Sequence, residues 1–211
     1  MTVLWIGLAS VIGYLLGSIP FGYIFVRLFT GQDVRAVGSG RTGSTNVMRA
    51  GGGKVALLTG VCDALKAAGA VWLAQWLVPQ TPWAEVGAGL AAILGHNYSL
   101  FLGFKGGAGG APTVGATAGI WFGSLGLVVP VGALIWYFVG YASLTTISFA
   151  VTAICIMLAR WLLGAGPAEH IVFAVLALAL CLWSLRPNLK RLREGTERRH
   201  GWHARKAKPQ T

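Results

Sequence analysis

Residues 3–29, VLWIGLASVIGYLLGSIPFGYIFVRLF, decide the fold class of this chain, because they form one long apolar run with Arg27 as its one charge. A helix needs about 20 apolar residues to cross the hydrocarbon core of a bilayer, so the run is long enough. It also lacks the basic start and short apolar core of a cleavable signal peptide. We therefore expect it to remain in the protein as a membrane span.

The rest of the chain has the same character. Its 211 residues are 55% hydrophobic and 11% charged, whereas roughly 25% of the residues of an average soluble domain are charged. The sequence predicts an all-α polytopic membrane protein with seven transmembrane helices. The expected spans lie near residues 3–29, 55–78, 83–104, 113–129, 131–147, 149–165 and 168–185, and the fourth and fifth are divided only at Pro130.

The basic residues predict the orientation. Lys and Arg gather in the loop 30–54, at Lys105 and in the segment that starts at Arg186, and such clusters mark cytoplasmic segments. Even numbers of expected spans separate these three regions, so the N-terminus should lie outside and the C-terminus in the cytoplasm. We expect residues 1–195 to form the membrane domain and residues 196–211 a mobile basic tail on an anionic leaflet. This topology accounts for the net charge of +11 without a nucleic-acid partner.

Four polar blocks lie between or just after apolar runs. Glycine lets backbone N–H groups turn toward an anion, Arg and Lys add positive charge, and Ser, Thr and Asn add donors. The blocks therefore predict a phosphate site at a membrane surface. They are GSGRTGSTN at 38–46, KGGAGG at 105–110, YASLTT at 141–146 and RPNLKR at 186–191.

The first block leaves three interpretations open. Gly38 and Gly43 have the spacing of a nucleotide-binding P-loop, but Ser44 occupies the lysine position and an apolar helix, not a strand, precedes the block. A plain turn explains the glycines alone. A phosphate site also explains the accompanying Arg41 and Arg49.

The other polar residues also have plain alternatives. Lys105 could be a snorkelling lysine before a flexible turn, and the basic residues after position 185 could be an ordinary anchor, although Asn188 does not fit that explanation. Asp63 and Lys66 stand three residues apart in one span, and we expect them to form an internal, structural ion pair. His96 is expected to be packed and hydrogen-bonded, because no second metal ligand stands at i+3 or i+4, and no metal site is predicted.

With these motifs, the chain resembles the bacterial acyl-phosphate:glycerol-3-phosphate acyltransferases, the PlsY family. The family motif GSGN-x-GATNV-x-R is similar to residues 38–49, and its GH-x-FP…F-x-GFKGGKGVAT is similar to residues 95–113. Its stretches RY-x-SLSSI and HREN-I-x-RL-x-x-GTE are similar to residues 141–147 and 185–197. The resemblance covers nearly the whole chain, with the motifs in order.

Four departures from these motifs bear on the charge and shape of the site. Arg41 replaces an asparagine, Ala108 a lysine, Leu185 a histidine and Pro187 a glutamate. Arg41 could restore one of the lost charges. Pro187 is also expected to bias the preceding residues away from helix. The chain could therefore be a divergent enzyme or a relative with altered substrate or activity.

The resemblance implies acyl transfer from acyl phosphate to the sn-1 hydroxyl of glycerol 3-phosphate at a bacterial inner membrane, with membrane lipids around the protein and no cofactor. Catalytic roles fall on Asn188, Ser143 and Lys105. Phosphate binding falls on Ser39, Gly40, Arg41, Thr45, Asn46, Arg49, Gly106, Gly107 and Arg186. The alternative from another class is a membrane binding or transport protein for an organic phosphate.

Overall fold

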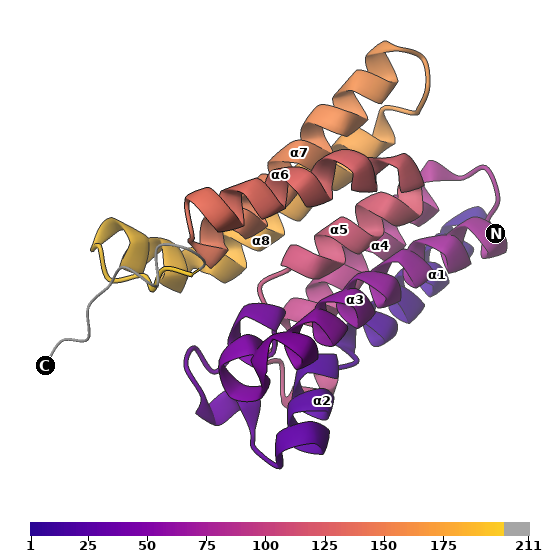
Figure 1. The fold of residues 1–211 in the computed structure, drawn as a ribbon. Helices are drawn as coiled ribbons and strands as arrows, with labels where there is room; N and C mark the ends of the chain where they lie inside the picture. Colours follow the sequence, from indigo (N-terminus) through magenta and orange to yellow (C-terminus); the bar gives the residue numbers. More distant parts are fainter. Residues whose placement is uncertain (201–211) are drawn as a thin grey trace, which may run out of the picture.

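The computed structural model describes residues 1–200, which form a helical protein with its long helices side by side (Figure 1). The helices α6, α7 and α8 form one group beside α1, α3, α4 and α5 (Figure 1). The α-helices are α1 (Thr2–Ser18), α2 (Phe21–Thr30), α3 (Ser44–Leu77), α4 (Pro82–Asn97), α5 (Gly110–Ile120), α6 (Leu125–Phe138), α7 (Ala142–Leu162) and α8 (Glu169–Arg193). Three short 3-10 helices join them, η1 (Val34–Ala36), η2 (Leu100–Leu102) and η3 (Phe122–Ser124).

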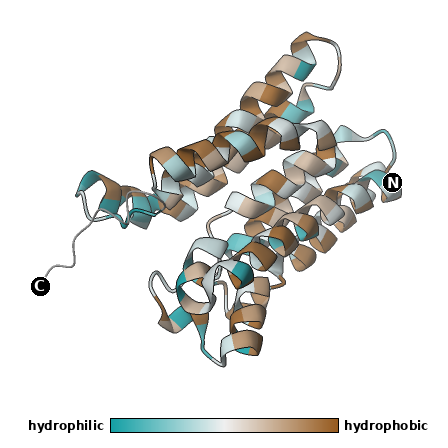
Figure 2. Ribbon diagram, viewed as in Figure 1, coloured by the Kyte–Doolittle hydropathy of each residue, from teal (hydrophilic) through white to brown (hydrophobic). Residues whose placement is uncertain are grey.

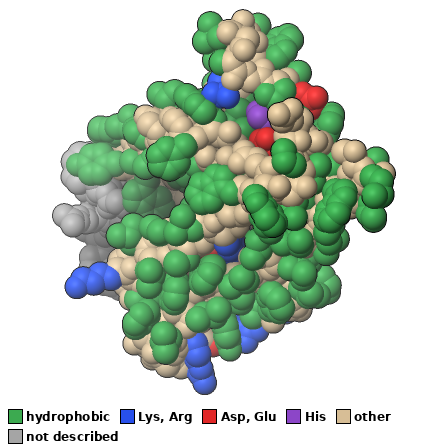
Figure 3. Space-filling model, turned by 90° about the vertical axis from the view of Figure 1, so that its right-hand side faces the viewer, with side chains coloured by type: hydrophobic (Ala, Val, Ile, Leu, Met, Phe, Trp, Pro, Cys, Tyr) green, Lys and Arg blue, Asp and Glu red, His purple; other side chains and the backbone are tan. Residues whose placement is uncertain are grey.

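The outer surface has the character of a membrane protein. Within the described residues, 4 segments are long and apolar enough to cross a membrane: Thr2–Thr30, Ser44–Leu77, Ala142–Leu162 and Glu169–Arg193. Large apolar side chains such as Leu57, Trp76 and Leu134 are exposed on the surface. Hydrophobic side chains dominate the face in Figure 3, and the hydrophilic residues in Figure 2 gather mainly near the helix ends. The expectation of an all-helical membrane protein is confirmed.

With α1 and α2 counted as one, successive long helices alternate in direction (Figure 1), which brings all four polar blocks to one end of the bundle. The opposite end, where α1, α4, α6 and α8 begin and α3, α5 and α7 end, carries a group of tryptophans. Tryptophan is enriched at the interface between membrane and water, so this end matches a membrane boundary. The group consists of Trp5, Trp76, Trp83, Trp121 and Trp161.

Small residues let α1 and α4 pack with their backbones in direct contact. A side chain at Gly13 or Gly17 would collide with the backbone of Ala88 or Ala92 on α4, and one at Gly95 would collide with α1. In a membrane, where helices gain little from hydrophobic burial against each other, close backbone approach of this kind is a main source of association. The α1–α4 pair therefore forms a closely packed unit that supports the site.

The expected single span 3–29 is in fact two helices that meet at Ile19–Pro20. Pro20 has no N–H to donate to Leu16, and it drives Ile19 to an extended ψ of 117°. The carbonyl of Leu16 accepts from Ile19 N instead, at 3.2 Å. A buried lysine, Lys66, donates to the carbonyl of Ile19 at 2.7 Å, so the break is satisfied inside the protein.

The boundary expected at Pro130 was wrong. Pro130 lies inside α6, and the break comes earlier, at η3 between Trp121 and Leu125. A proline within a membrane helix is tolerated when its surroundings satisfy the freed carbonyl. The break is made instead by Trp121, which is extended (φ −149°, ψ 107°) and lies against Gly123, where a side chain would meet its indole ring.

The loop expected at 30–54 is shorter in the structure. The helix α3 begins at Ser44, so the second half of the first polar block forms the start of a 34-residue helix. Gly52, with φ 80° and ψ 178°, kinks this helix near the place where the membrane span was expected to begin. The kink separates a short N-terminal piece, which carries site residues, from the long apolar piece.

The expected pair of Asp63 and Lys66 is confirmed, and it forms the centre of a buried cluster. Lys66 Nζ lies 2.7 Å from Asp63 Oδ1. His96 Nδ1 lies 3.2 Å from Lys66 Nζ and 3.4 Å from Asp63 Oδ1. Together with the bond to the Ile19 carbonyl, this cluster joins the end of α1, the middle of α3 and the end of α4. His96 is packed and hydrogen-bonded, as expected.

Replacing Lys66 by methionine should destabilise the protein by ~3–5 kcal/mol, because the carboxylate of Asp63 would remain buried without its partner. Thermal unfolding in detergent would measure the change. The double variant Asp63→Asn, Lys66→Met should lose less than Lys66→Met alone, since no unpaired charge remains. A Lys66→Met protein as stable as the parent would show that the pair does not carry this energy.

Candidate active site

The four polar blocks meet at one end of the bundle through contacts between residues distant in sequence. Thr42 N donates to the carbonyl of Gly106 at 3.4 Å, which joins the first block to the second. Arg41 Nη2 donates to the carbonyl of Ser184 on α8. Tyr141, in the third block, forms an isolated β-bridge with Arg199. These contacts bring the four blocks, or residues next to them, to the same end of the bundle.

A cavity of about 1100 Å³ opens in this region between α3, α6, α7 and α8. Its polar end includes Ser39, Arg49 and Asn188, and its walls toward the middle of the bundle are apolar. Several apolar wall residues on α3 and α6 are exposed, including Leu57 and Val129. The cavity therefore joins a cationic, donor-rich end to an accessible apolar channel. Its apolar walls are formed by Leu57, Val61, Leu65, Val114, Leu125, Val129, Ala133, Trp136 and Phe149.

A second, smaller cavity of about 480 Å³ holds the remaining predicted cations. Gly40, Lys105, Gly106, Gly107 and Arg186 line it. The predicted residues are thus divided between two cavities, except Ser143, which is buried and lines neither of them.

One residue, Arg41, lines both cavities. Its Nη2 donates to the carbonyl of Ser184, while its Nη1 is buried without a hydrogen-bond partner among residues 1–200. The guanidinium therefore retains donors at the boundary of the two cavities. A second polar atom with the same property lies nearby, the Oδ1 atom of Asn97.

Asn46 organises the first block. Its Nδ2 lies within 3.0 Å of the carbonyls of Val34, Val37 and Arg41, and its Oδ1 accepts from Ser39 N at 3.0 Å. A side chain at Gly38, which has φ 57°, would collide with this amide. The amide of Asn46, expected to bind phosphate, is engaged in holding the loop in shape. Ser39 is left facing the large cavity.

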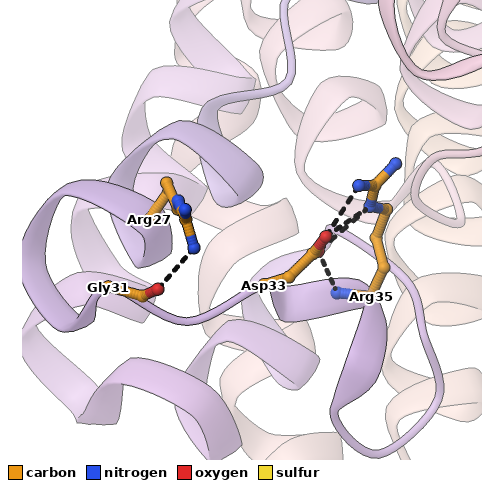
Figure 4. Close-up of polar contacts among 4 residues, drawn as sticks. All are labelled: Arg27, Gly31, Asp33 and Arg35. Carbon is orange, nitrogen blue, oxygen red and sulfur yellow. Dashed lines mark hydrogen bonds and ion pairs between the residues drawn. The ribbon is translucent and has the colours of Figure 1, made fainter.

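The entrance to this loop is fixed by two arginines, shown in Figure 4. Arg27 Nη1 donates to the carbonyl of Gly31 at 2.6 Å, and Arg35 pairs with Asp33, with Nη2 and Oδ2 2.6 Å apart. Hydrogen bonds from Arg35 lower the pKa of Asp33 to about 2. Both contacts are exposed to solvent, so they shape the turn more than they stabilise the fold.

Two helices begin at the large cavity. Gly43, Ser44 and Thr45 at the start of α3 line it, as do Gly110 and Ala111 at the start of α5. The first N–H groups of a helix have no partner within the helix and carry partial positive charge, so they favour anions. Thr45, predicted as a binding residue, lies at the start of α3 and lines this cavity.

In the structure, Gly106 and Gly107 have a different role from the one that the sequence predicted. We expected a backbone that lies against a ligand. In the structure a side chain at Gly106 would collide with the carbonyl of His96, and one at Gly107 would collide with the His96 ring. Gly107 N donates to the same His96 carbonyl at 2.9 Å. The glycines allow the loop to lie flat on the end of α4, and this contact positions Lys105.

Asn188 and Ser143 are joined by a carboxylate that the sequence analysis did not select. Glu197 Oε2 accepts from Ser143 Oγ at 2.6 Å, and Glu197 Oε1 accepts from Asn188 Nδ2 at 3.0 Å. Ser143 is fully buried and is occupied by this bond. Asn188 Oδ1 is buried, faces no hydrogen-bond partner among the described residues, and belongs to a residue that lines the large cavity. Glu197 thus fixes the amide so that its oxygen is available as an acceptor.

Glu197 could have been found from the sequence. It is the carboxylate of the stretch Gly195-Thr196-Glu197 within the last motif, among basic neighbours. It was assigned to the tail because the tail was expected to be mobile. The residues 196–200 instead pack against the start of α7, so the expected boundary at 195 falls before a packed segment. The remainder of the expected tail, 201–211, lies outside the described residues.

The helix α8 continues through Pro187 to Arg193, although Pro187 was expected to bias the residues before it away from helix. Pro187 cannot donate to the carbonyl of Trp183, and Arg186 Nε donates to that carbonyl instead, at 3.2 Å. The side chain of Arg186 therefore repairs the helix at the edge of the smaller cavity. The continuous helix brings Leu185 and Asn188 to the large cavity.

Comparison with known proteins identifies the family of this chain. A family model described as glycerol-3-phosphate acyltransferase matches residues 7–195. A relative named glycerol-3-phosphate acyltransferase from Agrobacterium fabrum is 40% identical over 200 residues, covering 93% of this chain and 92% of the relative. One of the same name from Syntrophomonas wolfei is 39% identical over 187 residues, covering 89% of this chain and 93% of the relative.

Solved structures show the same fold. Crystal structures of PlsY, an integral membrane glycerol 3-phosphate acyltransferase, match in a glycerol 3-phosphate form and a lysophosphatidic acid form. The first has a TM-score of 0.80 at 34% identity and covers 93% of this chain and 96% of that chain. The second has a TM-score of 0.79 at 32% identity, with coverage of 93% and 95%. This chain belongs to the glycerol-3-phosphate acyltransferase family, and the resemblance to PlsY is confirmed.

Proposed function

We propose that this protein transfers a fatty acyl group from an acyl phosphate to the sn-1 hydroxyl of glycerol 3-phosphate, giving lysophosphatidate and inorganic phosphate. The observation that carries the proposal is the large cavity, which joins a cationic end to an apolar channel. An acyl phosphate has the same division, with an anionic head and an apolar chain. The family membership supports the reaction class.

The two cavities suggest a place for each substrate. The phosphate of the acyl donor would lie against Arg49, Ser39 and the start of α3, with its chain along the apolar walls. Glycerol 3-phosphate, which is small and has no apolar chain, fits the smaller cavity with Lys105 and Arg186. Arg41, which lines both cavities, would lie between the two phosphates and reduce their repulsion.

The chemistry needs little beyond position and charge, because the acyl phosphate is already activated. The hydroxyl oxygen forms a bond to the carbonyl carbon, and the bond between that carbon and the phosphate oxygen breaks. The leaving phosphate takes the hydroxyl proton. Asn188 Oδ1, held by Glu197, would accept a hydrogen bond from the attacking hydroxyl and direct its lone pair toward the carbonyl. Ser143 acts through Glu197, and the backbone of Gly40, Gly106 and Gly107 lies beside the phosphates.

The membrane placement belongs to the same proposal. Seven helices or helix pairs, with α1 and α2 counted as one, cross the inner membrane of a bacterium. The end that carries the four polar blocks faces the cytoplasm, where glycerol 3-phosphate is soluble, and residue 1 lies outside. The excess of Lys and Arg at this end supports this orientation.

The proposed reaction can be tested directly with purified protein in detergent. Acyl phosphate and glycerol 3-phosphate together should give inorganic phosphate and lysophosphatidate in equal amounts. Acyl phosphate alone, or with glycerol in place of glycerol 3-phosphate, is the control. Binding of either phosphate without any product would contradict the proposal and favour a binding or transport protein.

Replacing Arg49 or Lys105 by alanine should each lower kcat/KM by a factor that corresponds to ~1.5–3 kcal/mol, the range for a hydrogen bond to a charged group. Arg49→Ala should mainly raise the KM for acyl phosphate, and Lys105→Ala that for glycerol 3-phosphate, because the two residues line different cavities. Lys54→Ala is a matched control, since this exposed cation lines neither cavity. If both variants turn over like the parent, the site is elsewhere.

Ala108→Lys should raise kcat/KM by about tenfold, or ~1.4 kcal/mol of transition-state stabilisation, because Ala108 lines the large cavity and a lysine there adds charge near the phosphate. Ala108→Met, which adds length without charge, should not raise it. Initial rates at low substrate would measure both. If the parent protein is already fast and Ala108→Lys slows it, then Arg41 and the remaining groups form a complete site.

Cysteines introduced at positions 41 and 108 should be unreactive toward a membrane-impermeant maleimide added to intact cells, because both positions lie at the cytoplasmic end. A cysteine at position 80, in the turn between α3 and α4, should react. The measurement is labelling of each single-cysteine protein in a background without Cys62, Cys155 and Cys181. Labelling at 41 or 108 from outside would reverse the proposed orientation.

A further inference from the structure

The segment Thr196–His200, which we call the strap, returns from the end of α8 to the junction of α6 and α7. Gly195, with φ 71°, lets the chain turn back. His200 N then donates to the carbonyl of Gly140 at 2.7 Å, and Arg199 Nε donates to Tyr141 Oη at 2.8 Å. These contacts fix the backbone of the strap, so its last side chain has a defined position.

That side chain, His200, lies between an arginine of the site and a tryptophan of the cavity wall. Its Nε2 is 2.8 Å from Arg49 Nη2. Its ring stacks on Trp136, with ring centroids 4.8 Å apart and an angle of 15° between the planes. All three residues line the large cavity. The histidine therefore stands where the cationic end of the cavity meets its apolar wall.

The direction of the hydrogen bond follows from the chemistry of the two groups. A guanidinium has donors only, so Nε2 of His200 must be the acceptor, and the imidazole is neutral with its proton on Nδ1. Burial, followed by the positive charge of Arg49, lowers the pKa of His200 to about 4. Glu197 opposes this effect and Arg198 adds to it. The imidazole thus stays neutral at physiological pH and can hold the arginine continuously.

The contact fixes the second end of Arg49. Its Nη1 already donates to Asn46 Oδ1 at 3.3 Å, so each terminal nitrogen has one acceptor among residues 1–200. A guanidinium has five N–H donors, and within the described residues three of them remain for a bound anion. Gly38 has no side chain to push Arg49 away, since one there would crowd the Cδ and Nη1 atoms.

We propose that His200 is a positioning residue of the acyl transfer described above, which holds the guanidinium of Arg49 toward the substrate phosphate. The inference rests on the proposed function.

Two replacements separate the roles of the imidazole. His200→Phe keeps an aromatic ring for Trp136 but has no acceptor for Arg49. His200→Gln lacks the ring but has a carbonyl oxygen that can accept from the guanidinium. The KM for acyl phosphate should rise roughly tenfold or more in His200→Phe, as expected for a lost hydrogen bond to a charged group, with a smaller change in kcat. His200→Gln should stay within about threefold of the parent.

A double-mutant cycle with Arg49→Ala gives the decisive comparison. His200→Phe should have no further effect when Arg49 is already alanine, because the histidine acts through that arginine. Independent, multiplying effects would overturn the proposal, and so would a His200→Phe enzyme with the kinetics of the parent, or equal losses in His200→Phe and His200→Gln. If His200→Phe does not fold, His200→Leu takes its place in the cycle. A parent with no turnover would instead overturn the proposed function, and the role of His200 with it.

Discussion

The buried charge of Lys66 is the constraint on which the site depends. An ammonium group inside a membrane protein needs partners, and Lys66 finds them in Asp63, the carbonyl of Ile19 and His96. These partners belong to three helices, so satisfying one charge fixes where α1 ends and where α4 lies along α3. The glycine loop rests on His96. The position of Lys105 is therefore linked to an ion pair that lies apart from the smaller cavity.

The cationic end of the protein uses few of its polar groups for the substrate alone. Asn46 shapes the first loop, Ser143 holds Glu197, and Arg186 completes the helix at Pro187. Within the described residues, the groups that we propose for the substrates are the oxygen of Asn188, the remaining donors of Arg41 and Arg49, Lys105 and two helix starts. A layer of supporting contacts thus orients a smaller set of reactive groups, as accurate positioning requires.

The sequence predicted the helical membrane fold, the Asp63–Lys66 pair and the four blocks of the site, because long apolar runs, buried charges and glycine-rich motifs are local signals. It did not predict which proline breaks a helix. Pro20 does so where Lys66 can bind the neighbouring carbonyl, whereas Pro130 and Pro187 lie within helices. That difference depends on neighbours in space. Glu197 stands in a recognisable motif but was assigned to the tail, because no local pattern shows that the chain returns to Gly140.

The exposed apolar walls of the large cavity have a consequence for supply of the lipid substrate. Leu57 on α3 and Val129 on α6 line the cavity and are exposed, so the fatty chain of the proposed donor could pass between bilayer and site by sideways diffusion, without crossing water. The rate of encounter then depends on how many donor molecules occupy a given area of membrane, not on their concentration in the cytoplasm. A single-chain product released by the same route is already in the leaflet where the next enzyme of lipid assembly would meet it.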